Sequence, residues 1–137
     1  MQYGKHQGDE VRPRDAVLDI GAYEVDACVA PGVPGLVTGL RVAPDGTLTW
    51  DAGGDATSWD VSWGNVTLLQ SGGLPASIPR CLEDDSPDSR ASDPLFPPRG
   101  GAWYLVRGVN CAGNGSWDAG DPSQRASRDP SLASACP

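Results

Sequence analysis

The residues best suited to chemistry in this sequence are four widely spaced cysteines, Cys28, Cys81, Cys111 and Cys136. None belongs to a Cys-x-x-Cys pair, and the single histidine, His6, lies far from all of them along the chain. This spacing disfavours both a zinc site and a histidine-activated thiol nucleophile. An even set of cysteines in a small, loop-rich chain instead predicts two long-range disulfides, and the spacing leaves three connectivities open.

A second group of chemically capable side chains is acidic. Segment 83–88 holds four carboxylates, and Asp84, Asp85 and Asp88 offer the oxygen ligands that calcium prefers. Their spacing matches no EF-hand loop. We therefore interpret them as solvated aspartates in turns, keep calcium as the alternative, and expect no metal or other cofactor.

Composition and charge limit the classes of protein to which this chain can belong. The length of 137 residues suits one domain, and 18 glycines with 13 prolines exclude long helices, because Gly costs ~1 and Pro ~3 kcal/mol inside a helix. No apolar run approaches the ~18 residues of a membrane-spanning helix. A formal net charge of −8 disfavours nucleic acids and anionic membranes as partners.

Short runs with a period of two, separated by turn residues, dominate the chain from residue 36 onward. Leu48 and Trp50 share one face of a run, and Trp59, Val61 and Trp63 share a face of the next. Turn signals about 8–12 residues apart predict an all-β antiparallel sandwich without helices. The expected strands are 36–42, 47–52, 58–63, 66–70 and 102–110, with a weaker one from 114 and a Pro-Asp-Gly turn at 44–46.

The domain organisation follows from a Pro/Gly-rich segment near the start. Residues 26–35 contain Pro31, Gly32, Pro34 and Gly35, which is typical of a linker. We therefore expect a short N-terminal extension (1–25), a linker (26–35) and one domain (36–137). The first residues carry no apolar stretch of a signal peptide, so the cysteines suggest the tail of a longer exported protein.

The strand motifs from residue 40 onward resemble a fibronectin type III domain. The resemblance covers about residues 36–125 and rests on the following motifs: Leu40-x-Val42, Leu48-x-Trp50-Asp51, Trp59-Asp60-Val61 and Tyr104-x-Val106-x-Gly108-x-Asn110. Cys81-Leu82, Asn110-Cys111 and Ala135-Cys136-Pro137 are similar to a cysteine-bearing variant at the ends of bacterial exported proteins. The chain departs from the family in residues 71–100, an enlarged connection between strands C′ and E.

This resemblance implies a fibronectin III/immunoglobulin-like β-sandwich and several roles. Its core would contain Trp50, Trp59, Val61, Tyr104 and Val106. Tyr104 would form a tyrosine corner, with its hydroxyl bonded to the backbone near the E–F connection. An E strand would lie at 90–93. The family's loop arrangement would bring Cys81 to Cys111 and leave Cys28 with Cys136.

The leading segment carries a second resemblance. Arg12-Pro13 followed by Asp19-Ile20-Gly21-Ala22-Tyr23-Glu24 is similar to the terminal coil of right-handed parallel β-helix proteins. Solenoid coils need neighbouring repeats to bury their apolar faces. Residues 1–25 would then be the remnant of a β-helix that precedes the domain.

The expected exposure of Trp103 and Trp117 distinguishes two possible functions. We expect Trp117 to be exposed and Trp103 to lie on the face opposite Tyr104, so together they could form a carbohydrate platform. The favoured hypothesis is a non-catalytic extracellular or cell-surface module that serves as a spacer, cap or adhesion surface at the end of a bacterial β-helix protein. The alternative is a carbohydrate-binding module of a β-helix polysaccharide lyase or hydrolase. Partners would be surface or matrix proteins or polysaccharides.

Overall fold

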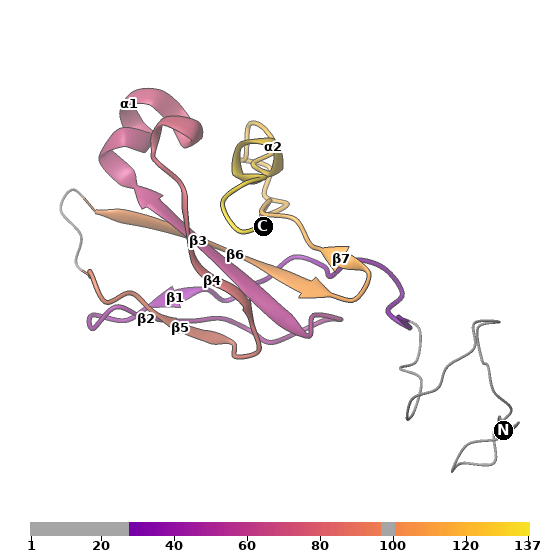
Figure 1. Cartoon of the computed structure of the whole chain (residues 1–137). Helices are drawn as coiled ribbons and strands as arrows, with labels where there is room; N and C mark the ends of the chain where they lie inside the picture. The colour runs from indigo at the N-terminus through magenta and orange to yellow at the C-terminus, as the bar shows by residue number, and fades with distance from the viewer. Residues whose placement is uncertain (1–27, 97–100) are drawn as a thin grey trace, which may run out of the picture.

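A computed structural model describes residues 28–96 and 101–137, which form two antiparallel sheets and two short helices (Figure 1). The three-stranded sheet, in spatial order, consists of β1 (Arg41–Val42), β2 (Thr47–Thr49) and β5 (Arg90–Ser92). The four-stranded sheet consists of β4 (Arg80–Ser86), β3 (Ser58–Asn65), β6 (Ala102–Asn110) and β7 (Gly113–Asn114). The helices are α1 (Val66–Ala76) and α2 (Asp129–Leu132). The predicted antiparallel β class is thus confirmed as two antiparallel sheets, and β5 lies within the range 90–93, where a strand was expected.

The turn between β1 and β2 shows how local sequence fixes a strand pair. Gly46 adopts a φ of 82°, which costs glycine little and side chains with a Cβ more. A Cβ at this position would also lie 2.8 Å from the carbonyl oxygen of Asp93. The carboxylate of Asp45 accepts a hydrogen bond from the backbone N–H of Thr47 at 3.0 Å, and hydrogen bonds to Thr47 hold the pKa of Asp45 below its usual value. The Pro-Asp-Gly turn expected at 44–46 is confirmed.

The inner core lies between the two sheets. Its buried members come from both of them and are Leu48, Trp50, Trp59, Val61, Ala91 and Val106, with Tyr104 partly buried against them. The rings of Trp50 and Trp59 meet edge to face with centroids 6.4 Å apart, a favoured aromatic geometry. The period-two pattern therefore placed the expected core side chains on the inner faces.

Residues 66–70, expected as a strand, begin helix α1 instead. The side chain of Asn65, the last residue of β3, accepts a hydrogen bond from the backbone N–H of Leu68 at 3.0 Å and caps the helix. The helix is kinked at Gly73, where φ is 78°, and Pro75 follows, which has no N–H to donate. The prediction of a helix-free domain is therefore wrong. Neither described helix has the length and apolar character needed to cross a membrane.

The described part of the expected linker is attached to the domain. Asn110 donates a side-chain hydrogen bond to the carbonyl oxygen of Gly32 at 2.9 Å, and Pro34 is buried beside Gly108. A disulfide joins Cys28 to the turn after β6. Residues 28–35 are therefore attached to the domain at Cys28, Gly32 and Pro34, although most of their side chains are exposed. Residues 1–25, with the β-helix motif, lie outside the described residues.

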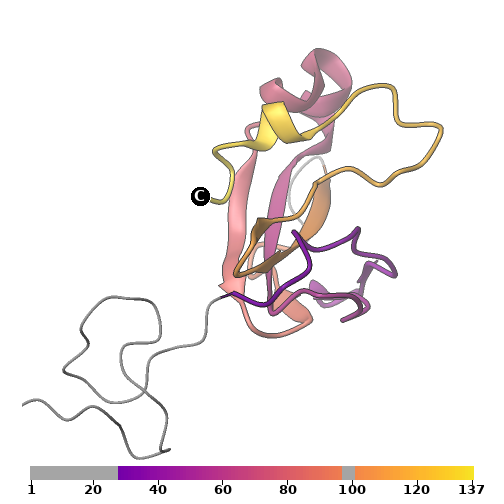
Figure 2. The same cartoon turned by 90° about the vertical axis from the view of Figure 1, so that its right-hand side faces the viewer.

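The outer face of the four-stranded sheet is also covered. Chain segment 115–137, which includes α2, runs back over this face, and α2 lies beside α1 at one end of the sheet (Figures 1 and 2). A second buried cluster forms there from Trp117, Leu132, Ala135 and Cys136. We call segment 115–137 the C-terminal cover.

Candidate functional site

The four cysteines form two disulfides with a connectivity different from the one that the resemblance implied. Cys28 pairs with Cys111 and Cys81 pairs with Cys136, with Cα–Cα distances of 5.4 and 5.0 Å. The expected pairs Cys81–Cys111 and Cys28–Cys136 are wrong. Cys81 lies within β4, where it is the cross-strand partner of Ser62. Both residues are on the outer face, which the C-terminal cover packs against. Cys111 follows β6 at the end of the sheet where the N-terminal segment is attached.

The acidic segment 83–88, whose first residues belong to β4, does not form a site of its own. Within residues 28–96 and 101–137, the set of three possible metal ligands close together is Cys81, Asp84 and Cys136, and its two sulfurs are already bonded to each other. Asp85 accepts a hydrogen bond from the hydroxyl of Ser58 at 3.4 Å. Asp84 and Asp88 are exposed. The structure thus does not bring the calcium candidates Asp84, Asp85 and Asp88 together.

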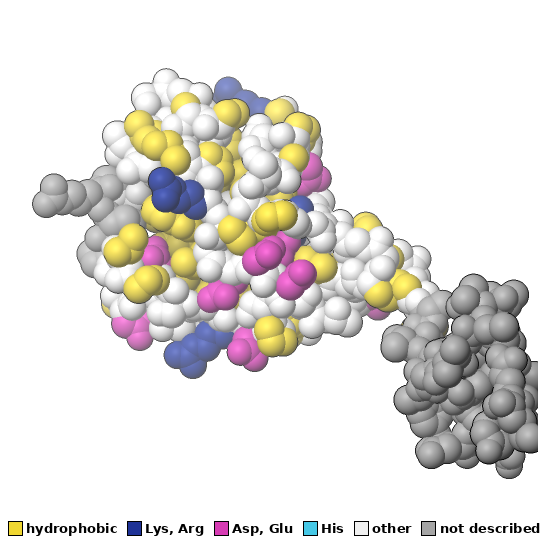
Figure 3. Space-filling view, in the orientation of Figure 1, with side chains coloured by type: hydrophobic (Ala, Val, Ile, Leu, Met, Phe, Trp, Pro, Cys, Tyr) yellow, Lys and Arg dark blue, Asp and Glu magenta, His cyan; other side chains and the backbone are white. Residues whose placement is uncertain are grey.

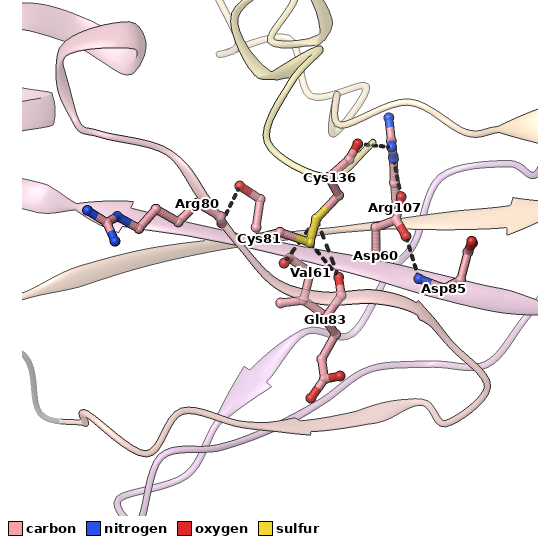
Figure 4. The surroundings of a disulfide bond; sticks show 9 residues. Asp60, Val61, Arg80, Cys81, Glu83, Asp85, Arg107 and Cys136 are labelled. Atoms are coloured by element: carbon pink, nitrogen blue, oxygen red, sulfur yellow. Dashed lines mark hydrogen bonds and ion pairs between the residues drawn. A yellow bond between two sulfur atoms is a disulfide. The ribbon is translucent and has the colours of Figure 1, made fainter.

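A buried ion pair lies beside the Cys81–Cys136 disulfide (Figure 4). The Nε of Arg107 on β6 donates to a carboxylate oxygen of Asp60 on β3 at 2.7 Å. The other oxygen of Asp60 accepts from the backbone N–H of Asp85 at 2.9 Å. A terminal nitrogen of Arg107 donates to the carbonyl oxygen of Cys136 at 2.9 Å. Both charges are therefore hydrogen-bonded, and Arg107 connects the sheet to the C-terminal cover.

Trp117, near the start of the C-terminal cover, is buried in the second cluster, with 2% of its surface exposed. The guanidinium carbon of Arg107 lies 4.6 Å from the centroid of its ring, within the range of a cation–π contact. Asp129 accepts hydrogen bonds from the backbone N–H of Trp117 at 2.7 Å and from the hydroxyl of Ser116 at 2.8 Å. The expectation that Trp117 is exposed is wrong, because the outer face offers Arg107 as a stacking partner and the chain turns back over it.

Tyr104 bonds to a side chain near the expected connection. Its hydroxyl donates to a carboxylate oxygen of Asp93 at 2.6 Å, just after β5. Burial, the hydrogen bond to Asp93 and the negative charge of Asp93 raise the pKa of Tyr104 above its usual value. The acceptor is thus a side-chain carboxylate just after β5, where the resemblance implied the backbone.

A groove of about 810 Å³ lies between α1 and the C-terminal cover. Its apolar surface comes from α1 and the outer face of β6, and its polar wall comes from the loop before α2. The described lining residues are Leu69, Gly73, Leu74, Trp103, Leu105, Ser123, Gln124, Arg125, Ala126 and Arg128. Apolar side chains gather in this region between α1 and the C-terminal cover (Figure 3).

Trp103 lies against a glycine on the floor of this groove. It is the cross-strand partner of Gly64, and a Cβ at position 64 would lie only 2.8 Å from the indole nitrogen of Trp103. The indole therefore occupies the space above Gly64, an arrangement in which an aromatic ring covers a strand glycine. The same side chain also lines the groove. Of the two tryptophans predicted as a ligand surface, Trp103 lines this groove and Trp117 is buried.

The polar wall of the groove is fixed by Asp118. One oxygen of its carboxylate accepts hydrogen bonds from the side-chain amide of Gln124 and from the backbone N–H of Arg128, both at 2.7 Å. These bonds, led by that of Arg128, hold the pKa of Asp118 below its usual value. Gln124 also accepts from the backbone N–H of Ala119 at 2.9 Å. The wall is therefore a hydrogen-bonded loop with Arg125 exposed at its rim.

The sequence contained one signal for the covered face. Alternate residues of β6 are apolar on both sides: Tyr104 and Val106 face inward, while Trp103 and Leu105 belong to the outer cluster. A strand that is apolar on both faces is typical of burial on both faces. The pairing of Asp60 with Arg107 follows from the register of β3 against β6, in which the two residues are direct partners. The exposed position of Arg125 at the groove had no comparable signal, because it depends on the path of segment 115–137.

Searches for similar proteins found no match to the chain among family models, curated proteins or solved structures.

Proposed function

We propose that this chain is a non-catalytic module of an exported protein, a spacer, cap or adhesion surface at the C-terminal end of a bacterial β-helix protein. One observation carries the proposal: the side chains that could act in catalysis already bond to other parts of the domain. The four cysteines are joined in two disulfides. Asp60 is paired with Arg107, and Tyr104 with Asp93. A catalytic site needs such groups to be available to a substrate.

The strand arrangement supports a fibronectin III/immunoglobulin-like sandwich as the architecture of the module. Immunoglobulin-like sandwiches place strands A, B and E in one sheet and C, F and G in the other. The order β1-β2-β5 corresponds to A, B and E. The order β4-β3-β6-β7 corresponds to C′, C, F and G. The proposed family differs from this chain in α1 and in the C-terminal cover.

The disulfides indicate that the chain folds in an oxidising compartment, because cytosolic thiols are kept reduced. The experiment that tests the proposal is to read the gene upstream and to isolate the secreted product. We expect one reading frame that encodes an export signal and β-helix repeats before this module, and a purified module without turnover of polysaccharides. A purified module that depolymerises a polysaccharide, or an upstream frame without β-helix repeats, would refute it.

A second candidate function, carbohydrate binding, is favoured by the position of Trp103. A two-tryptophan platform is excluded because Trp117 is buried, but Trp103 lines a groove large enough for a small ligand. Affinity electrophoresis in gels that contain polysaccharide tests this function. We expect retardation of the wild type and its loss in Trp103→Leu, which keeps apolar volume over Gly64. Equal retardation of both proteins, with equal melting curves, would argue against it.

A further inference from the structure

We propose that the groove between α1 and the C-terminal cover binds an acidic oligosaccharide, with a sugar ring on Trp103 and a carboxylate at Arg125. This inference rests on the carbohydrate-binding function proposed above and names its substrate class. It follows from the exposed charge on the groove lining and from the setting of Trp103.

The exposed charge on the groove lining, that of Arg125, is opposite in sign to the net charge of the chain. The whole protein has a formal net charge of −8, yet among the described residues that line the groove there are two arginines and no carboxylate. The charge of Arg128 is offset by the neighbouring carboxylate of Asp118, and its guanidinium donates to the carbonyl oxygen of Trp117 at 3.2 Å. Arg125 is exposed, and no carboxylate in the described part of the chain pairs with its guanidinium. An anionic group on the ligand would complement Arg125, and a carboxylate can meet a guanidinium through two parallel hydrogen bonds.

The floor of the groove offers a flat aromatic ring to a ligand. β6 is hydrogen-bonded to β3 over residues 102–109, whereas β7 pairs with β6 at Val109 and Asn110, at the end of the strand away from the groove. The indole of Trp103, seated on Gly64, supplies a broad apolar surface whose negative π face attracts the C–H groups of a sugar ring.

Two substitutions test the site without disturbing its supports. Arg125→Gln removes the exposed guanidinium, and Ala126→Glu places a carboxylate at an exposed lining position. The matched controls are Arg41→Gln and Ala52→Glu, at exposed positions outside the groove lining. Gln124 and Arg128 stay unchanged because they hold the wall.

The ligands are a trisaccharide of 1,4-linked β-glucuronate and its neutral counterpart, cellotriose, measured by titration calorimetry on the oxidised chain. We expect the glucuronate trimer to bind about tenfold more tightly, as one charge-assisted contact allows. Arg125→Gln and 1 M salt should each remove most of this preference, because salt screens an exposed contact. Ala126→Glu should abolish binding of the acidic trimer, and both controls should bind it like the wild type.

Each other outcome overturns the inference. Equal binding of both trimers would refute acidic selectivity while leaving carbohydrate binding in place. Binding of neither trimer would refute both this inference and the carbohydrate-binding function. Binding of an aspartate-rich peptide of equal charge in place of either sugar would assign the groove to a protein partner.

Discussion

The two faces of the four-stranded sheet are buried by different means. The inner face packs against a second sheet, and its contacts are almost entirely apolar: Trp59, Val61 and Val106 meet Leu48 and Ala91. The outer face is covered by chain that is mostly irregular, apart from short α2. There the contacts are a disulfide, an ion pair, a cation–π contact and side-chain caps. An irregular segment can therefore cover a sheet face when specific side-chain contacts replace the backbone hydrogen bonds that join strands.

The difference matters because irregular chain loses as much backbone entropy as a strand when it is ordered, about 1–2 kcal/mol per residue. The C-terminal cover satisfies its backbone through Asp118 and Asp129, which accept from backbone N–H groups of Arg128 and Trp117. Its end is fixed by Cys136, which is 1% exposed. The outer face is therefore expected to respond to charge and redox changes that leave the inner face unaffected.

The largest expected effects come from one tryptophan on each face. Trp59→Ala and Trp117→Ala should each lower the free energy of unfolding by about 3–5 kcal/mol, because each removes a buried ring and leaves a cavity. Chemical denaturation with matched m-values measures both. A loss below about 1 kcal/mol for Trp117→Ala would mean that the C-terminal cover does not pack as described.

The next effect on stability comes from the ion pair of Asp60 and Arg107, which lies on the outer face of the sheet. Arg107→Met leaves Asp60 charged and buried without its partner, so the free energy of unfolding should fall by about 3–5 kcal/mol. The double variant Arg107→Met/Asp60→Asn should recover part of this loss, since no unpaired charge remains. Equal stability of the single and double variants would show that desolvation of Asp60 is not the cause.

The two disulfides should differ in their rate of reduction. Cys28 and Cys111 are both exposed, whereas Cys136 is buried, and thiol–disulfide exchange requires access to a sulfur. Mild reductant applied to the folded protein should therefore open Cys28–Cys111 first. Differential alkylation followed by mass spectrometry measures the order, and simultaneous opening of both bonds would argue against a rigid C-terminal cover.

The smallest effect is a pH dependence on the inner face. The folded-state pKa of Tyr104 is raised, so its contribution to stability is complete below the unfolded value of about 10. It is lost progressively as pH rises above that value, because the unfolded chain ionises first. The melting temperature should therefore fall above about pH 10. Tyr104→Phe should show a shallower fall; an unchanged slope would assign the alkaline transition to other groups.

Sequence reasoning predicted the inner face better than the outer one for a physical reason. Alternation along a strand reports which side is buried, and it placed Trp50, Trp59 and Val61 correctly. Helix α1 was missed because Val66-Thr-Leu-Leu looks like a strand unless Asn65 is recognised as a cap. The burial of Trp117 and the partner of Cys81 depend on long-range chain return, which local periodicity does not encode.

The most direct test of the covered outer face is a disulfide map of the oxidised protein, obtained by proteolysis without reduction and mass spectrometry of the linked peptides. We expect peptides that join Cys81 to Cys136 and Cys28 to Cys111. The first of these links is what holds the end of the C-terminal cover against β4. Peptides that join Cys81 to Cys111, or a free thiol at Cys136, would contradict a sheet buried on both faces.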